Sequence, residues 1–191
     1  VVLPTGVQLK LPFSCNAPFI QDPSRMGIKS PALSPTNRWL LKRIGKLAAE
    51  RMIEWLSNTS LKNEERRKAY ELLPYKENED DSLESNVSKL IIQSFHEVVR
   101  FKPIILSSSG RLVLPNECYT PPMEVYDIWS PDQIVKAFSH GENHVLNQTI
   151  TKTYRKKLRS WGYIDETDLQ TFLRFSLRDS VPRPKQFESL S

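Results

Sequence analysis

The sequence is poor in the residues that build metal and disulfide sites. It has two cysteines, Cys15 and Cys118, and three histidines in 191 residues. The cysteines lack the paired spacing of a zinc site, and one pair is weak evidence for a disulfide framework, so we expect reduced, structural thiols. His140 and His144 are four residues apart, but Gly141 between them predicts a turn instead of the unbroken helix that two ligands at this spacing need. No metal site is therefore expected.

Long apolar runs and glycine-rich loops are also missing. No apolar stretch approaches the roughly 18 to 20 residues that span a bilayer, so we expect a cytoplasmic protein that does not use a membrane. The loop at Ser107–Gly110 has one glycine and no helix start after it, which argues against a phosphate loop. The chain begins at Val1, inside an apolar run with no start signal. This predicts a piece of a longer protein.

Positive charge is concentrated in the first third of the chain. The formal net charge is +5, and residues 1–73 hold 12 Lys and Arg against 6 Asp and Glu. This excess favours an anionic partner: a nucleotide phosphate, a nucleic acid or an acidic protein surface.

The periodicity of apolar residues predicts an α+β protein that is predominantly helical. Ser34 and Pro35 supply a cap and a first-turn proline for a long helix to residue 56. Its apolar stripe is expected at Leu40, Leu41, Ile44, Leu47, Ala48, Met52 and Trp55. Further helices are expected at 63–73, 85–100, 131–139, 147–160 and 165–178, with a β-hairpin at 104–114. The acidic stretch 76–84 is expected to link a first region, 1–75, to a helical subdomain with the hairpin, 85–191.

The first candidate site is the arginine that follows the opening apolar segment. Residues 11–20 are apolar and aromatic, which predicts a buried strand. Arg25 would then lie just after the end of this strand, at the opening of the site formed where the strand packs. An arginine there suits phosphate binding, because its planar fork of donors stays charged and can grip a phosphate bidentately. The alternative is a solvated loop arginine.

A basic cluster in the predicted helix 147–160 is the second candidate. The cluster consists of Lys152, Arg155, Lys156, Lys157 and Arg159, and the aromatic residues Tyr154 and Trp161 lie beside it in the sequence. They could contact the phosphates of a nucleic acid, or they could be a solvated helix face. The four tryptophans are expected in the core or at interfaces, and no serine lies in a nucleophile-elbow pattern.

The first third of the chain resembles a known family. The run Leu11-Pro12-Phe13-Ser14-Cys15-Asn16-Ala17-Pro18-Phe19, then Pro23-Ser24-Arg25, then Asn37-Arg38-Trp39-Leu40-Leu41 heading a long helix, is similar to the segment after the nucleotide-binding domain in sacsin-like proteins. Those proteins are GHKL-type ATPases. A looser likeness extends to the middle domain of the large heat-shock chaperones. The resemblance covers residues 3–56.

The resemblance implies a role for two cations. In that family the arginine reaches the terminal phosphate of ATP held by the preceding domain, so Arg25 is the implied catalytic residue. Chaperones of this class carry a glutamine four residues later, where this sequence has Lys29. Related gyrase-type enzymes make a similar contact with a lysine of their second domain, which implies that Lys29 is a second phosphate-binding residue. It also implies that residues 1–75 are the end of a chaperone-like middle, or transducer, domain. ATP and Mg²⁺ would be cofactors of the parent protein and would not be bound by this chain alone. The implied partners are the N-terminal nucleotide-binding domain of the same protein and a client protein. The alternative is a non-enzymatic module that binds nucleic acid or protein.

Overall fold

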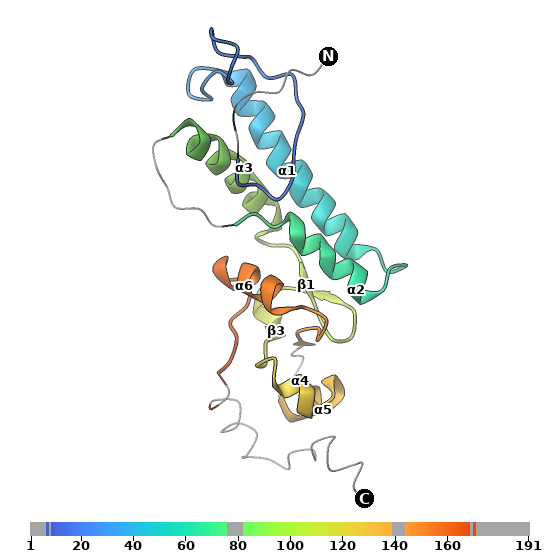
Figure 1. The fold of residues 1–191 in the computed structure, drawn as a ribbon. Coiled ribbons are helices and arrows are strands. Elements are labelled where there is room, and N and C mark those ends of the chain that lie inside the picture. Colours follow the sequence, from blue (N-terminus) through green and yellow to red (C-terminus); the bar gives the residue numbers. More distant parts are fainter. Residues whose placement is uncertain (1–6, 8, 76–81, 139–143, 169, 171–191) are drawn as a thin grey trace, which may run out of the picture. The chain divides into compact units, whose positions relative to one another are not determined.

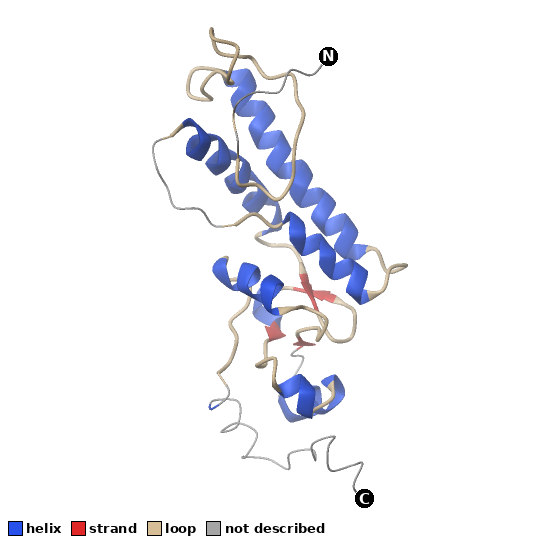
Figure 2. Cartoon of the chain, viewed as in Figure 1, coloured by secondary structure: helices blue, strands red, loops and turns tan. Residues whose placement is uncertain are grey.

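The structure is a computed structural model that describes residues 7, 9–75, 82–138, 144–168 and 170. Helices predominate among these residues, and the short strands form two two-stranded sheets (Figures 1 and 2). The predicted class, α+β and predominantly helical, is confirmed. By its internal contacts the chain divides into unit 1, residues 1–55 and 69–101, and unit 2, residues 56–68 and 102–191.

The predicted linker at 76–84 lies outside the described residues over 76–81. Its last two residues, Leu83 and Glu84, begin α3 (Leu83–Val99). The helix starts there, two residues before the predicted start, because the side chain of Ser82 accepts a hydrogen bond from the backbone N–H of Ser85 at 3.1 Å. This is the ordinary N-cap interaction.

The long helix α1 (Pro35–Ser57) matches the prediction of 34–56. Ser34, which is buried, accepts a hydrogen bond at its Oγ from the backbone N–H of Asn37 at 3.3 Å. Its carbonyl oxygen accepts another from the N–H of Arg38 at 3.0 Å. Ser34 therefore caps the helix, and Pro35 occupies the first turn, where its missing N–H costs nothing.

In unit 1, helices α1 and α3 lie side by side (Figure 1). Leu41, Ala49 and Met52 are fully or almost fully buried on α1. The backbones approach closely at Gly45, where an added Cβ would lie 2.1 Å from the carbonyl oxygen of Ile91. The predicted apolar stripe is correct at Leu41 and Met52. It is wrong at Leu47, 43% exposed, and Trp55, 36% exposed.

The predicted opening strand is absent. Residues 11–20 are irregular, and the only bridge nearby pairs Gln21 with Ile28. Pro12 and Pro18 lack the N–H that a ladder needs, and no described strand lies beside them. The segment instead places Leu11, Phe13 and Phe19 against the buried cluster of unit 1. That cluster consists of Ile28, Leu41, Val87 and Ile91.

In unit 2 the predicted hairpin is confirmed. Strand β1 (Ile105–Leu106) pairs antiparallel with β2 (Leu112–Val113), and the turn contains Gly110 at φ 78°. The predicted helix 63–73 is present as α2 (Asn63–Arg66), which continues as a 3-10 helix, η1 (Arg67–Leu72). Arg66 of α2 is buried and donates from Nη1 to the carbonyl oxygen of Gly110 at 2.7 Å, which ties this helix to the hairpin.

A second small sheet follows. After a 3-10 turn, η2 (Pro115–Glu117), strand β3 (Cys118–Tyr119) pairs parallel with β4 (His144–Val145). Helices α4 (Val125–Ile128) and α5 (Pro131–Phe138) lie between them in sequence. The predicted capping box of α5 is confirmed, since the N–H of Ser130 donates to Gln133 Oε1 at 2.8 Å. A buried cluster of this region contains Val125, Trp129, Ile134 and Val145.

Helix α6 (Lys152–Ser160) is shorter than the predicted 147–160. Its expected first turn is irregular, because the side chain of Asn147 accepts from the N–H of Thr149 at 3.0 Å and donates to the carbonyl oxygen of Ser107 at 2.9 Å. Such a side-chain turn competes with helix formation. The C-terminal end is as predicted, with Gly162 at φ 69°.

The predicted helix 165–178 does not begin at Asp165. Residues 165–168 are not helical, and Glu166 forms a parallel bridge with Thr120. The N–H of Thr167 donates to the carbonyl oxygen of Thr120 at 3.1 Å. The rest of the predicted helix lies outside the described residues, apart from residue 170. Asp165 and Asp168 resemble a capping pattern in sequence, but pairing with residue 120 decides the local structure.

Candidate functional site

The candidate phosphate-contacting residues lie on a short hairpin, residues 20–29, in unit 1. Gln21 and Ile28 form the antiparallel bridge at its base. The N–H of Lys29 donates to the carbonyl oxygen of Ile20 at 2.8 Å, and the N–H of Asp22 donates to that of Gly27 at 3.1 Å. These bonds fix the path of the chain on both sides of the turn. The periodicity of the sequence did not predict a hairpin at these residues.

The carboxylate of Asp22 organises the tip of the hairpin. Its Oδ1 accepts a hydrogen bond from the hydroxyl of Ser24 at 2.8 Å and a longer one from the N–H of Gly27 at 3.4 Å. The Ser24 hydroxyl in turn accepts from the N–H of Met26 at 3.2 Å. The hydrogen bond from Ser24 is the main cause that lowers the pKa of Asp22 below its ordinary value. The turn is therefore most stable with Asp22 ionised.

Arg25 lies at the tip in a left-handed backbone conformation, with φ at 60°. In the described part of the chain it is the only non-glycine residue with a positive φ. This conformation costs an L-residue about 1 kcal/mol. The N–H of Arg25 donates to the carbonyl oxygen of Asp22 at 3.0 Å, and its side chain is exposed. Among the described residues none gives the guanidinium an ion-pair or hydrogen-bond partner.

Lys29, the second predicted phosphate ligand, is the last residue of the hairpin. Its backbone is held on both sides, because its N–H bonds to Ile20 and its carbonyl oxygen accepts from Nδ2 of Asn37 at 2.8 Å. Its side chain is exposed. No described residue pairs with its ammonium group. The structure thus places both predicted cations on one hydrogen-bonded loop, with their charged ends in solvent.

The sequence did not predict the structural role of Asn37 at this site. It is fully buried in the first turn of α1, and its side chain bonds to the backbone of Ile20 and of Lys29. It therefore fastens both ends of the hairpin to the helix. The only signal in the sequence is an asparagine between the helix cap and Trp39, and that pattern is equally typical of a solvated first turn.

The basic cluster of α6, in unit 2, does not form one solvated face. Arg155 is 2% exposed and Lys157 is 6% exposed, whereas Lys152, Lys156 and Arg159 are exposed. Two of the five predicted nucleic-acid contacts thus point into the protein. The sequence could not separate them, because a helix of this composition gives no sign of which basic side chains have buried partners.

Arg155 is the centre of a buried polar cluster. Its Nη1 donates to Glu166 Oε1 and to the carbonyl oxygen of Pro121, each at 2.7 Å, and its Nε donates to the carbonyl oxygen of Ile150 at 3.2 Å. The guanidinium carbon lies 5.4 Å from the ring centroid of Tyr126. Glu166 also pairs with Arg159, so one carboxylate serves two cations. Through these contacts, Arg155 and Arg159 bind the segment around Glu166 to α6, which is a structural role for both arginines.

The thiol of Cys118 lies near this cluster. Burial raises its pKa to about 12, against a smaller lowering by the positive charge of Arg155. Its thiolate is scarce at neutral pH, which agrees with the expected structural role. Both cysteines are free, as expected from the sequence.

The described ranges contain no group of three or more His, Cys, Asp or Glu side chains that could hold a metal ion. His144 lies in β4, and His140 and Gly141 lie outside those ranges. Within the same ranges, no helix has both the length and the apolar character to cross a membrane.

Comparison of the chain with protein-family models, with curated proteins and with solved structures gives no match. The case for a function therefore depends on the geometry above.

Proposed function

We propose that the hairpin at residues 20–29 is a phosphate-contacting element of a sacsin-like GHKL-type ATPase. Arg25 would contact the terminal phosphate of ATP and stabilise the charge that develops during its transfer, and Lys29 would be a second phosphate ligand. The observation that carries the proposal is the position of Arg25. An exposed guanidinium without a described partner sits at the tip of a turn whose backbone is hydrogen-bonded on every side.

The rigidity of the turn supports this role. The hydrogen bonds of the turn fix the backbone from which the Arg25 side chain extends, and a cation whose starting point is fixed needs less ordering in the transition state than one on a free loop. Phosphoryl transfer depends mainly on such positioning and on compensation of charge. The left-handed conformation of Arg25 adds to the argument, because it is a backbone strain at an exposed residue that makes no stabilising side-chain contact among the described residues.

The nucleotide itself would be bound elsewhere. The chain has no glycine-rich lid and no recognisable adenine-reading aspartate, so ATP and Mg²⁺ would be held by an N-terminal nucleotide-binding domain of the same protein. This chain alone is not expected to hydrolyse ATP. Since Asn37 fastens the hairpin to α1, a displacement of Arg25 on hydrolysis would be passed to that helix. Such coupling could act on a client protein, as in a chaperone-like transducer domain.

The test is ATP turnover by the complete protein at saturating nucleotide. Arg25→Ala is expected to lower turnover roughly a hundredfold or more, with the affinity for ATP changed little. Arg25→Lys keeps the charge and loses the planar fork, so we expect an intermediate loss. ATP affinity is measured separately with a fluorescent analogue. Equal turnover by wild type and Arg25→Ala would show that the assignment is wrong.

The matched control is Arg51→Ala. Arg51 is also an exposed arginine of unit 1, with a side chain 72% exposed that pairs with Glu54 on the surface of α1. We expect it to keep full turnover. If Arg25→Ala and Arg51→Ala lose activity equally, the loss comes from the change in net charge, and Arg25 makes no specific contact with phosphate.

A further inference from the structure

The first four turns of α1 carry an unusual distribution of charge. Residues 35–49 contain four cations and no carboxylate. The N-terminal end of a helix is the positive end of its dipole, where acidic side chains are stabilising and basic ones are not. Of the four cations only Arg38 lies in the first turn, where this effect acts, so the helix dipole does not favour the charge at that position and gives no reason for the other three. We call five residues the basic face: Arg38, Trp39, Lys42, Arg43 and Lys46.

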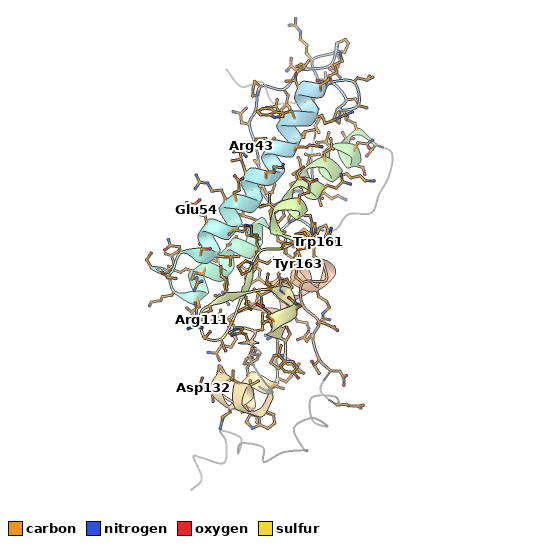
Figure 3. All side chains as sticks on the ribbon, turned by 180° about the vertical axis from the view of Figure 1, so that it is seen from behind. Arg43, Glu54, Arg111, Asp132, Trp161 and Tyr163 are labelled. Carbon is orange, nitrogen blue, oxygen red and sulfur yellow. The ribbon has the colours of Figure 1, made fainter. Side chains whose placement is uncertain are left out.

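These residues recur at intervals of three and four, which places them on one side of the helix. Arg38, Lys42 and Arg43 are exposed, and Lys46 is half-buried. Figure 3 shows Arg43 on the edge of α1 that is turned away from α3. The basic face is thus on the solvent side of unit 1.

Most of this charge is uncompensated. In the described ranges, no residue gives the ammonium group of Lys42 or Lys46 an ion pair or a hydrogen bond. Arg43 pairs with Glu50 at 3.6 Å, and its side chain remains 48% exposed. Arg38 donates from Nε to the carbonyl oxygen of Pro31 at 3.0 Å, which fixes the position of its guanidinium and leaves the charge unneutralised.

Trp39 lies in the middle of this charge and is 64% exposed. The sequence predicts all four tryptophans in the core or at interfaces, and Trp39 has no core position. Lys42 and Arg43 follow it at three and four residues, on the same side of the helix. An exposed aromatic ring among cations is the combination that binds single-stranded nucleic acids, with phosphates held by the cations and a base stacked on the ring. A purely acidic protein partner would explain the lysines and leave the ring without a role.

We propose that the basic face of α1 binds single-stranded nucleic acid, DNA or RNA. Arg38, Lys42 and Lys46 would contact successive phosphates, and Trp39 would stack against a base. The surface is distinct from the candidate phosphate-contacting hairpin and needs neither Arg25 nor Lys29. The inference therefore goes beyond the proposed ATPase function and does not depend on it.

The experiment is fluorescence anisotropy of the 191-residue chain with labelled oligothymidine and oligouridine of roughly 15 nucleotides. Affinity is measured between about 50 and 200 mM salt. The variant Lys42→Gln/Lys46→Gln is expected to lose at least tenfold in affinity at the lower salt. The slope of log affinity against log salt should become shallower by about 1.4, since each contact to a single strand contributes about 0.7. Trp39→Ala should lose roughly tenfold to a hundredfold with the slope unchanged.

The matched control is Lys62→Gln/Lys68→Gln, which removes the same charge from exposed positions outside the basic face and outside the basic cluster of α6. It should keep wild-type affinity and slope. Thermal melting of each variant verifies that it is folded, which we expect because the altered side chains are not core residues. The proposal is overturned if the wild type binds neither oligonucleotide, if Lys62→Gln/Lys68→Gln loses as much affinity as Lys42→Gln/Lys46→Gln, or if Trp39→Ala binds as tightly as wild type.

Discussion

Asn37 and Ile20 exchange two hydrogen bonds, each 2.8 Å long. The N–H of Ile20 donates to Asn37 Oδ1, and Asn37 Nδ2 donates to the carbonyl oxygen of Ile20. A third bond of 2.8 Å joins the same Nδ2 to the carbonyl oxygen of Lys29. One side chain thus supplies the backbone of the hairpin with the hydrogen bonds that a neighbouring strand would otherwise give. A buried side-chain amide at the start of a helix can therefore substitute for an absent sheet partner.

We expect Asn37→Ala to lower the free energy of unfolding by about 2 to 3 kcal/mol. The substitution leaves the N–H of Ile20 and the carbonyl oxygen of Lys29 without their partner, and an unsatisfied buried group costs about 1 to 3 kcal/mol. Urea unfolding measures the change. Thr36→Ala, at the exposed neighbouring position, is the control and should change stability by less than about 0.5 kcal/mol. A loss as small as that of the control contradicts the role given to Asn37.

The charge state of Asp22 should control the hairpin at low pH. Because the folded-state pKa of Asp22 is lowered, its contribution to stability is complete above the ordinary pKa and is lost as pH falls through the folded value. Ser24→Ala removes the main hydrogen bond to the carboxylate, so the pKa of Asp22 should rise toward its ordinary value. An NMR titration of the Asp22 side-chain carboxyl carbon measures the pKa of Asp22 in the wild type and in Ser24→Ala. Ser14→Ala, which alters another exposed serine, should leave this pKa unchanged.

Gly45→Ala should destabilise unit 1 by roughly 2 kcal/mol. At an exposed helix position this substitution would be stabilising by about 1 kcal/mol. Here the new Cβ would lie 2.1 Å from the carbonyl oxygen of Ile91, so α1 and α3 must separate. Gly162→Ala is the contrasting case, since nothing lies within 4 Å of its added Cβ. Its cost of about 1 kcal/mol comes from the left-handed backbone alone. Chemical denaturation of both variants tests the difference, and a stabilised Gly45→Ala protein would refute it.

Arg155→Met and Arg159→Gln should differ strongly although both remove a cation paired with Glu166. Arg155 is buried and loses three hydrogen bonds, so its substitution should cost about 3 kcal/mol. The side chain of Arg159 is 54% exposed, and an exposed pair contributes at most about 1 kcal/mol. Thermal or urea unfolding measures both changes. If the two variants lost a similar amount of stability, the burial of Arg155 would not determine how much its interaction with Glu166 stabilises the protein.

Elements with a local signal could be predicted from the sequence. Ser34 and Pro35 mark the start of α1, Ser130 with Gln133 marks the start of α5, and Gly162 marks the end of α6. In each case the atoms that decide the structure lie within one helical turn of one another. Predictions failed where a distant backbone decides. Residues 11–20 have the composition of a strand but no partner strand in the part of the chain that the structure describes. Glu166 pairs with Thr120 although Asp165 could cap a helix.

The candidate site divides in the same way. The exposure of Arg25 and Lys29 agrees with what the sequence suggests, because loop cations generally remain in solvent; their role as phosphate contacts stays a prediction. Asn37 is missed because its three bonds reach 8 and 17 residues back along the chain. Arg155 and Lys157 look like their exposed neighbours in sequence, since burial of a cation depends on acceptors such as Pro121 and Glu166 that come from other segments.

The left-handed conformation of Arg25 has a consequence for how variants of this protein can be screened. Glycine at position 25 would relieve about 1 kcal/mol of backbone strain and would add roughly 0.5 to 1 kcal/mol of unfolded-state entropy, so the two effects nearly cancel. A library sorted by expression yield or melting temperature would therefore accept Arg25→Gly as neutral. Measurements of folding alone therefore do not report on this position, and the proposed phosphate contact of Arg25 has to be tested by ATP turnover.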